Sequence, residues 1–120
     1  MKNHHPELRA AVWRMVIELL RATYDARFPK GNHFGADAEK LLVYGAAVMM
    51  HLDGAPARAS KIAQYLDLPN QTARRHLDKL VRWGLLEREG RVYAEGPASR
   101  RFVRLNVVEH LMREAVRQLQ

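Results

Sequence analysis

The sequence predicts a mainly α-helical protein with one small β-hairpin. Two observations carry this prediction: apolar residues recur at steps of three and four over most of the chain, and two short strand-like runs joined at a glycine interrupt that pattern once. Hydrophobic residues make up 48% of the chain and charged residues 28%, which is typical of a protein that folds. At 120 residues the chain is expected to be a single domain with one core.

Residues 6–28 are expected to form a long helix with two apolar faces. One face carries Leu8, Val12, Met15, Leu19, Ala22 and Ala26, and the other carries Trp13, Val16, Ile17, Leu20 and Tyr24. A helix that is apolar on two sides must be covered on two sides. A two-fold partner can supply the second cover, so this helix is predicted to dimerise. The alternative is a central helix in a monomeric core.

Two further helices are expected after a loop rich in glycine and proline. Asp37 stands where it can cap the second helix, whose apolar side continues to Leu52 before residues 53–56 end it. Ser60 stands where it can cap a short third helix over residues 61–66.

Residues 67–69 are long enough only for a tight turn, and a helix over residues 70–83 is expected to follow it. Ala73, Leu77 and Leu80 form the apolar side of this helix, and Gly84 ends it. The opposite side is strongly polar.

A hairpin and a last helix complete the predicted elements. Residues 85–88 and 91–94 are predicted to be strands that Glu89-Gly90 connects. Ser99 can cap a final helix over residues 98–119, which is apolar over more than one face and is therefore also predicted to dimerise.

A short helix, a tight turn, a longer helix and a hairpin, in that order, follow the plan of a winged helix-turn-helix, predicted here over residues 37–94. In a helix-turn-helix the second helix enters the major groove of DNA, and its first residues contact base edges. Arginine matches the major-groove edge of guanine, and asparagine or glutamine matches that of adenine. Asn70, Gln71, Arg74 and Arg75 are therefore predicted to contact bases.

The same motif carries a net positive charge. From residue 58 to residue 91 the chain carries eight basic and four acidic residues, a net charge of +4. The start of the short helix and the two sides of the hairpin turn offer hydroxyl, amide and cationic groups to phosphates. Each such side chain alone is also typical of a solvated surface, but the set lies on one motif. The predicted DNA-binding residues are Ser60, Lys61, Asn70, Gln71, Arg74, Arg75, Lys79, Arg88 and Arg91.

Residues 60–68, 72–80 and 83–88 together resemble the winged-helix transcriptional regulators of the MarR-like kind, with ArsR-like repressors as the less similar group. The resemblance implies a homodimer whose N- and C-terminal helices pair, and two recognition helices that bind a palindromic site on double-stranded DNA as a repressor. Two features depart from the family. Asp67 stands where such motifs often have a left-handed glycine, and the hairpin tip is shorter than the basic wing loop of MarR-like proteins.

Charge and composition favour the same partner. The net charge of +7 and the isoelectric point near 10.2 favour a polyanion, of which nucleic acid is the leading candidate and anionic lipid the alternative. The longest apolar run, residues 45–50, is too short to span a membrane, and the N-terminus lacks the uncharged core of a signal peptide. The absence of cysteine suits a reducing compartment. A cytoplasmic, bacterial-type protein without a membrane partner is expected.

No enzyme activity, cofactor or metal is predicted. The sequence contains no glycine-rich phosphate loop, no nucleophile elbow and no histidine pair at helical i, i+4 spacing. A small-molecule effector cannot be inferred. Two other functions stay open: a winged helix used as a protein-interaction or assembly module, and a phage or plasmid replication or partition factor that binds DNA through the same surface.

Overall fold

A computed structural model describes residues 5–99 and 105–119 of the chain. The chain divides into two compact units: a terminal unit of residues 1–26 and 102–120, and a central unit of residues 27–101. Within the described residues there are five α-helices and one two-stranded antiparallel sheet. The predicted mainly helical chain with a small hairpin is confirmed.

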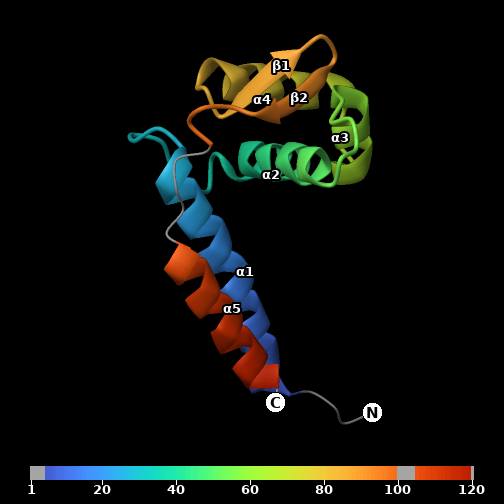
Figure 1. Ribbon diagram of the computed structural model, residues 1–120. Coiled ribbons are helices and arrows are strands. Elements are labelled where there is room, and N and C mark those ends of the chain that lie inside the picture. The colour runs from blue at the N-terminus through green and yellow to red at the C-terminus, as the bar shows by residue number, and fades with distance from the viewer. Residues whose placement is uncertain (1–4, 100–104, 120) are drawn as a thin grey trace. The chain divides into compact units, whose positions relative to one another are not determined.

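The central unit is built on α2 (Ala38–Leu52), against which α3 (Ala59–Leu66), α4 (Asn70–Arg82) and strand β2 (Val92–Glu95) all pack. Strand β1 (Leu86–Glu89) packs on α4 and pairs with β2. Figure 1 shows α4 and the hairpin on one side of α2, with α3 at one end of it. The apolar faces of the elements meet in a common core, whose fully buried members include Val43, Ala47, Ile62, Ala73, Leu77, Leu80, Leu85 and Leu86.

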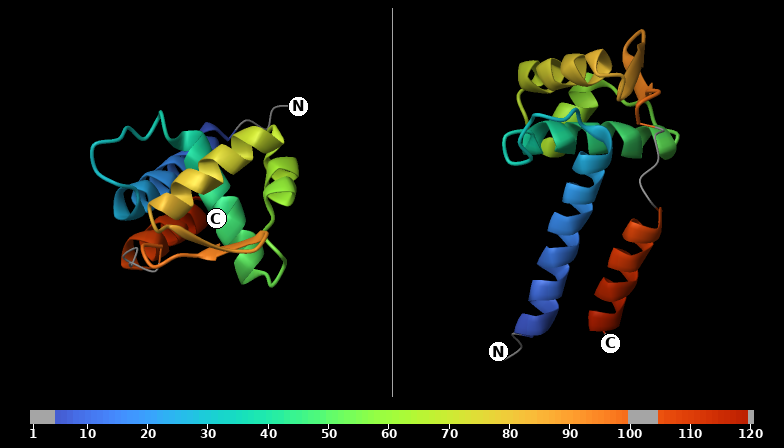
Figure 2. Two further views of the ribbon diagram at one scale, coloured as in Figure 1. Left: turned by 90° about the horizontal axis from the view of Figure 1, so that it is seen from above. Right: turned by 90° about the vertical axis from the view of Figure 1, so that its left-hand side faces the viewer.

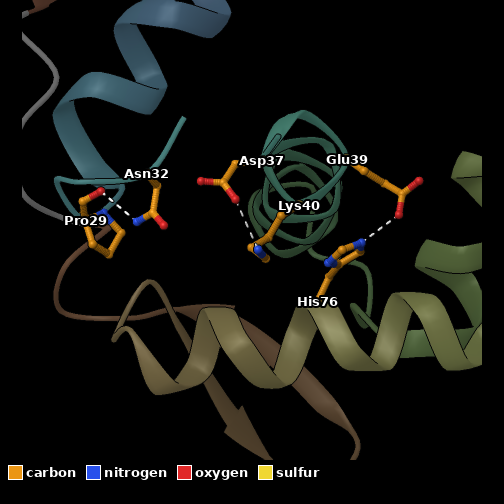
Figure 3. Close-up of polar contacts among 6 residues, drawn as sticks. All are labelled: Pro29, Asn32, Asp37, Glu39, Lys40 and His76. Atoms are coloured by element: carbon orange, nitrogen blue, oxygen red, sulfur yellow. Dashed lines mark hydrogen bonds and ion pairs between the residues drawn. The ribbon is translucent and has the colours of Figure 1, made fainter. Parts of the chain in front are cut away.

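Helices α2 and α3 begin without the side-chain caps that the sequence suggests. The Asp37 side chain makes no capping hydrogen bond at the start of α2, and its Oδ1 instead lies 3.2 Å from Lys40 Nζ (Figure 3). Helix α3 begins at Ala59, two residues before the predicted start, with Arg58 at the cap position. Ser60 is therefore inside the helix, and the prediction that it caps α3 was wrong.

The turn between α3 and α4 depends on a left-handed residue. Asp67 has φ 56° and ψ 51°, the conformation in which such motifs often place glycine. Its N–H and that of Leu68 bond to the carbonyls of Gln64 and Ala63, at 3.3 and 2.8 Å, which closes α3. Pro69 then precedes α4, as suits a residue with a fixed φ before a helix.

The hairpin is shifted by one residue from the prediction. Leu86 pairs with Glu95 and Glu89 with Val92, so the connection is Gly90-Arg91 and not Glu89-Gly90. Gly90 has φ +61°, and a left-handed glycine is favoured as the first residue of a two-residue hairpin turn. Arg91 therefore lies in the tip itself.

Two further contacts fix the hairpin in the central unit. The Tyr93 N–H donates to the Ala57 carbonyl at 2.9 Å in an isolated antiparallel bridge, so the segment before α3 lies along the outer edge of β2. At the other end, a Cβ at Gly96 would collide with the carbonyl oxygen of Gly84, so only glycine lets the chain leaving β2 cross the end of α4 this closely.

Ser99 joins three parts of the central unit. Its Oγ donates to Glu95 Oε2 at 2.8 Å, so the very close Tyr44 hydroxyl must donate to Ser99 Oγ. Arg27 Nε donates to the Ser99 carbonyl at 3.1 Å. Burial raises the pKa of Tyr44, which keeps the phenol protonated as the donor that this arrangement needs.

The predicted last helix does not include its first two residues. The helix expected over residues 98–119 is described as α5 (Leu105–Leu119), while Ala98 and Ser99 lie in a turn and residues 100–104 are outside the described residues. Ser99 is buried, and its hydroxyl is engaged by Tyr44 and Glu95.

In the terminal unit α1 (Pro6–Arg27) lies beside α5, antiparallel to it (Figures 1 and 2). Ala11 of α1 and Ala115 of α5 are buried and line the same small hollow, so this side of α1 faces α5. The other side of α1 is exposed despite being apolar, with Trp13 65% and Ile17 50% exposed. Of the predicted second apolar face, Trp13, Val16 and Ile17 are exposed, whereas Leu20 is half-buried and Tyr24 is buried.

The strained turn gives a first prediction. Asp67→Gly should raise the free energy of unfolding by about 0.5–1 kcal/mol, because glycine adopts positive φ without the cost that a side chain incurs there, although it loses more backbone entropy. Urea denaturation of the variant and the parent chain measures the difference. Asp67→Ala is the control and should be destabilising, since alanine tolerates this conformation less well than aspartate. If glycine destabilises as much as alanine, the turn is held by the Asp67 side chain instead.

Candidate nucleic-acid interface

The helix that the sequence predicts to enter DNA has two chemically distinct faces. Ala73, Leu77 and Leu80 of α4 are fully buried against the central core. The opposite face is exposed and carries amide, guanidinium and carboxylate groups, from Asn70, Gln71, Arg74, Arg75, Asp78 and Arg82. The core thus holds α4 by one side and leaves the polar side free for a partner.

Beside this exposed face lies a groove of about 910 Å³, which we call the arginine groove. Three elements form it: the start of α3, the middle of α4, and the hairpin. Its lining residues are Arg58, Ala59, Ser60, Arg74, Asp78, Arg88, Arg91, Val92 and Tyr93. Four arginines and one aspartate give the groove a net positive charge, which attracts phosphate groups.

The backbone pairing described above brings these arginines together. The bridge between Ala57 and Tyr93 places Arg58, the next residue, beside the hairpin. Arg91 reaches the groove from the hairpin tip. Arg88 is held within the hairpin, because its Nε donates to the Gly90 carbonyl at 2.8 Å and its guanidinium lies 5.8 Å from the centre of the Tyr93 ring.

The predicted residues fall into three groups. Ser60, Arg74, Arg88 and Arg91 line the arginine groove together. Asn70, Gln71 and Arg75 are exposed on α4, outside the groove lining, with Asn70 as the first residue of the helix.

The remaining two predicted residues, Lys61 and Lys79, lie elsewhere. Lys61 lines a separate, mainly apolar hollow of about 440 Å³ with Met50, Ala55, Pro56, Gln64 and Tyr65. Lys79 is half-buried, with Nζ 5.6 Å from the centre of the Trp83 ring, which also contacts Phe28 edge-on. Both lysines thus have apolar surroundings in addition to solvent.

Two charged lining residues, Arg58 and Asp78, were not among the predicted DNA-binding residues. Arg58 belongs to the predicted basic segment, but only the bridge between Ala57 and Tyr93 brings it beside the hairpin. Asp78 is one helical turn after Arg74, a spacing that places it on the polar side of α4, but its charge kept it out of the predicted set.

A polar contact fixes α4 on α2 near the interface. Glu39 Oε1 of α2 lies 2.6 Å from Nε2 of His76 on α4 (Figure 3). His76 therefore links α4 to α2. Within the part of the chain that the structure describes, no group of three or more histidine, cysteine, aspartate or glutamate side chains is arranged to hold a metal ion.

Residues 46–89 match the family model of a helix-turn-helix domain. The match runs from the middle of α2 to the end of β1, so it includes α3, the turn at Asp67 and α4. It supports a DNA-binding helix-turn-helix regulator. No curated protein and no solved structure matches the chain. Among the described helices, none is both long enough and apolar enough to cross a lipid bilayer.

The arginine groove of this helix-turn-helix region gives a second prediction. Arg58→Gln should weaken binding to all duplexes alike and reduce the steepness of log K against log salt concentration by about 0.9, the value of one phosphate contact. Fluorescence anisotropy with labelled duplex over a range of salt concentrations measures both quantities.

The matched control is Lys30→Gln, which makes the same change of net charge at an exposed position outside the groove. It should leave the slope unchanged. Equal slopes for Arg58→Gln and the parent chain would mean that Arg58 contacts no phosphate.

Proposed function

We propose that the chain is a sequence-specific regulator of transcription that binds double-stranded DNA as a homodimer, with α4 in the major groove. The single observation that carries the proposal is the arginine groove beside the exposed polar face of α4. A MarR-like repressor is the specific form that we propose, because helices α1 and α5 come before and after the helix-turn-helix region. Its place of action is then the cytoplasm of a bacterial cell, where the DNA lies.

The exposed face of α4 has the chemistry that base reading needs. Asn70, Gln71, Arg74 and Arg75 lie in its first two turns, and none of them is buried. In a helix-turn-helix these first turns meet base edges. Guanidinium and amide groups can make paired hydrogen bonds to guanine and adenine there.

The groove supplies contacts that do not depend on sequence. With α4 in the major groove, the start of α3 and the hairpin face the sugar-phosphate backbone on its flank. Arg58, Ser60 and Arg91 then bind phosphates and fix the register of the helix on the duplex. The charge of this surface also favours DNA over an assembly partner, since protein interfaces have cores depleted in charge.

The homodimer is proposed from the uncovered apolar side of α1. Trp13 and Ile17 are mostly exposed there, with Val12 and Val16 partly so, and on α5 Met112, Val116 and Leu119 are also exposed. Exposed apolar residues grouped in this way are typical of a protein interface. A second copy offers an identical surface, which is the requirement for a two-fold interface.

The function is tested by selecting bound sequences from a pool of random duplex DNA with the full chain. We expect a palindromic motif, and we expect Arg75→Ala to lower affinity for that motif by about 1–3 kcal/mol, the discrimination that one paired base contact provides. Affinity for random duplex should change much less. Arg75 is exposed, so the variant should fold as the parent does.

Three results would contradict the proposal in different ways. Binding that depends steeply on salt but selects no motif would indicate a nonspecific architectural protein. No binding at moderate salt would favour the protein-interaction module. An unchanged affinity of Arg75→Ala for the motif would remove Arg75 from the base-reading set.

The dimer has its own test. Trp13→Glu should convert the dimer to a monomer, because it places a charge in the proposed apolar interface. Light scattering coupled to gel filtration gives the mass in solution. Leu52→Glu is the control, since Leu52 is 69% exposed on α2 of the central unit and the change is of the same kind. A parent chain that is already monomeric at micromolar concentration would refute the homodimer.

A further inference from the structure

Asp78 is the acidic residue of the arginine groove. It lies on the exposed face of α4, one turn after Arg74 and one turn before Arg82. It lines the groove together with Arg58, Arg74, Arg88 and Arg91. Among the described residues, no ion pair or hydrogen bond joins its carboxylate to any of these arginines. The presence of the Asp78 carboxylate in the groove is therefore not explained by a structural ion pair with one of these arginines.

The position of the carboxylate has an electrostatic consequence for any bound phosphate. Each phosphate that the arginines attract into the groove also comes near the negative charge of Asp78, which repels it. Attraction to the phosphate backbone supplies essentially all of the affinity for random DNA. The same repulsion acts at a specific site, so Asp78 favours that site over random DNA only if its carboxylate gains a contact with a base there.

The carboxylate also restricts the base that it can face. An ionised carboxylate only accepts hydrogen bonds, so its partner must be a donor. In the major groove the donors are the amino groups of cytosine N4 and adenine N6, whereas guanine and thymine present acceptors there. Asp78 belongs to α4, the helix proposed to enter that groove.

We propose that Asp78 is a specificity-determining residue, which repels backbone phosphates and accepts a hydrogen bond from the amino group of a cytosine or an adenine. The inference rests on the proposed function, in which α4 lies in the major groove. In this proposal the base-contacting residues of α4 raise affinity for the specific site, and Asp78 lowers affinity for other DNA.

The test compares the full-length parent chain with Asp78→Asn, which keeps the shape of the side chain and removes its charge. Dissociation constants are measured for the duplex that the parent selects and for a random duplex, at one salt concentration. Affinity for the random duplex should rise about fivefold, the size of one close charge repulsion in water. The specific duplex gains the same relief but loses the charge-assisted base contact, so the ratio of specific to random affinity should fall. A repeated selection should show that one position, fixed as cytosine or adenine for the parent, becomes variable.

Two further variants complete the experiment. Asp53→Asn makes the same change of charge at the end of α2, where the side chain is exposed and outside the groove, and should leave the ratio unchanged. Asp78→Ala removes the charge and the acceptor together and should lower the ratio at least as much as Asp78→Asn. Circular dichroism checks that each variant is folded.

The outcomes separate this inference from the function on which it rests. If the parent chain binds neither duplex, or binds both equally, the proposed function fails and the role of Asp78 fails with it. If the parent discriminates and both Asp78 variants keep its ratio and its selected motif, only the role of Asp78 is overturned. A fall in the ratio that Asp53→Asn reproduces would also overturn it, since net charge alone would then explain the effect.

Discussion

The candidate interface depends on one backbone hydrogen bond, from the Tyr93 N–H to the Ala57 carbonyl. It joins the segment before α3 to the hairpin, in addition to the packing of β1 on α4 and of β2 on α2. With it, the segment before α3 becomes a third extended segment beside β2, and Arg58 is brought next to the hairpin. The arginine groove is a result of this pairing more than of any single arginine.

The elements that the sequence predicts well are those with local signals. The helix expected over residues 70–83 is observed as Asn70–Arg82, because Pro69 and Gly84 mark its ends and Ala73, Leu77 and Leu80 mark its buried side. The tight turn over residues 67–69 is likewise visible in the sequence from its length, and the resemblance to winged-helix regulators indicated the left-handed position at Asp67. These features depend on neighbours a few residues away.

The features that the sequence does not predict depend on distant partners. The hairpin was placed one residue early because both Glu89-Gly90 and Gly90-Arg91 contain the required glycine, and only the pairing of Leu86 with Glu95 decides between them. Ser99 has the residue type of a helix cap, but Tyr44 and Glu95 engage its hydroxyl. The grouping of Arg58 and Asp78 with the hairpin arginines depends on the same kind of long-range contact.

The bond between Arg27 and the Ser99 carbonyl has a consequence for how the chain is organised. The two residues stand where the polypeptide enters and leaves the central unit, so that unit begins and ends at neighbouring points. A segment with adjacent ends can be inserted into another protein without stretching its host. The helix-turn-helix region is thus arranged as a cassette, which evolution or an engineer could transfer between different pairs of flanking helices.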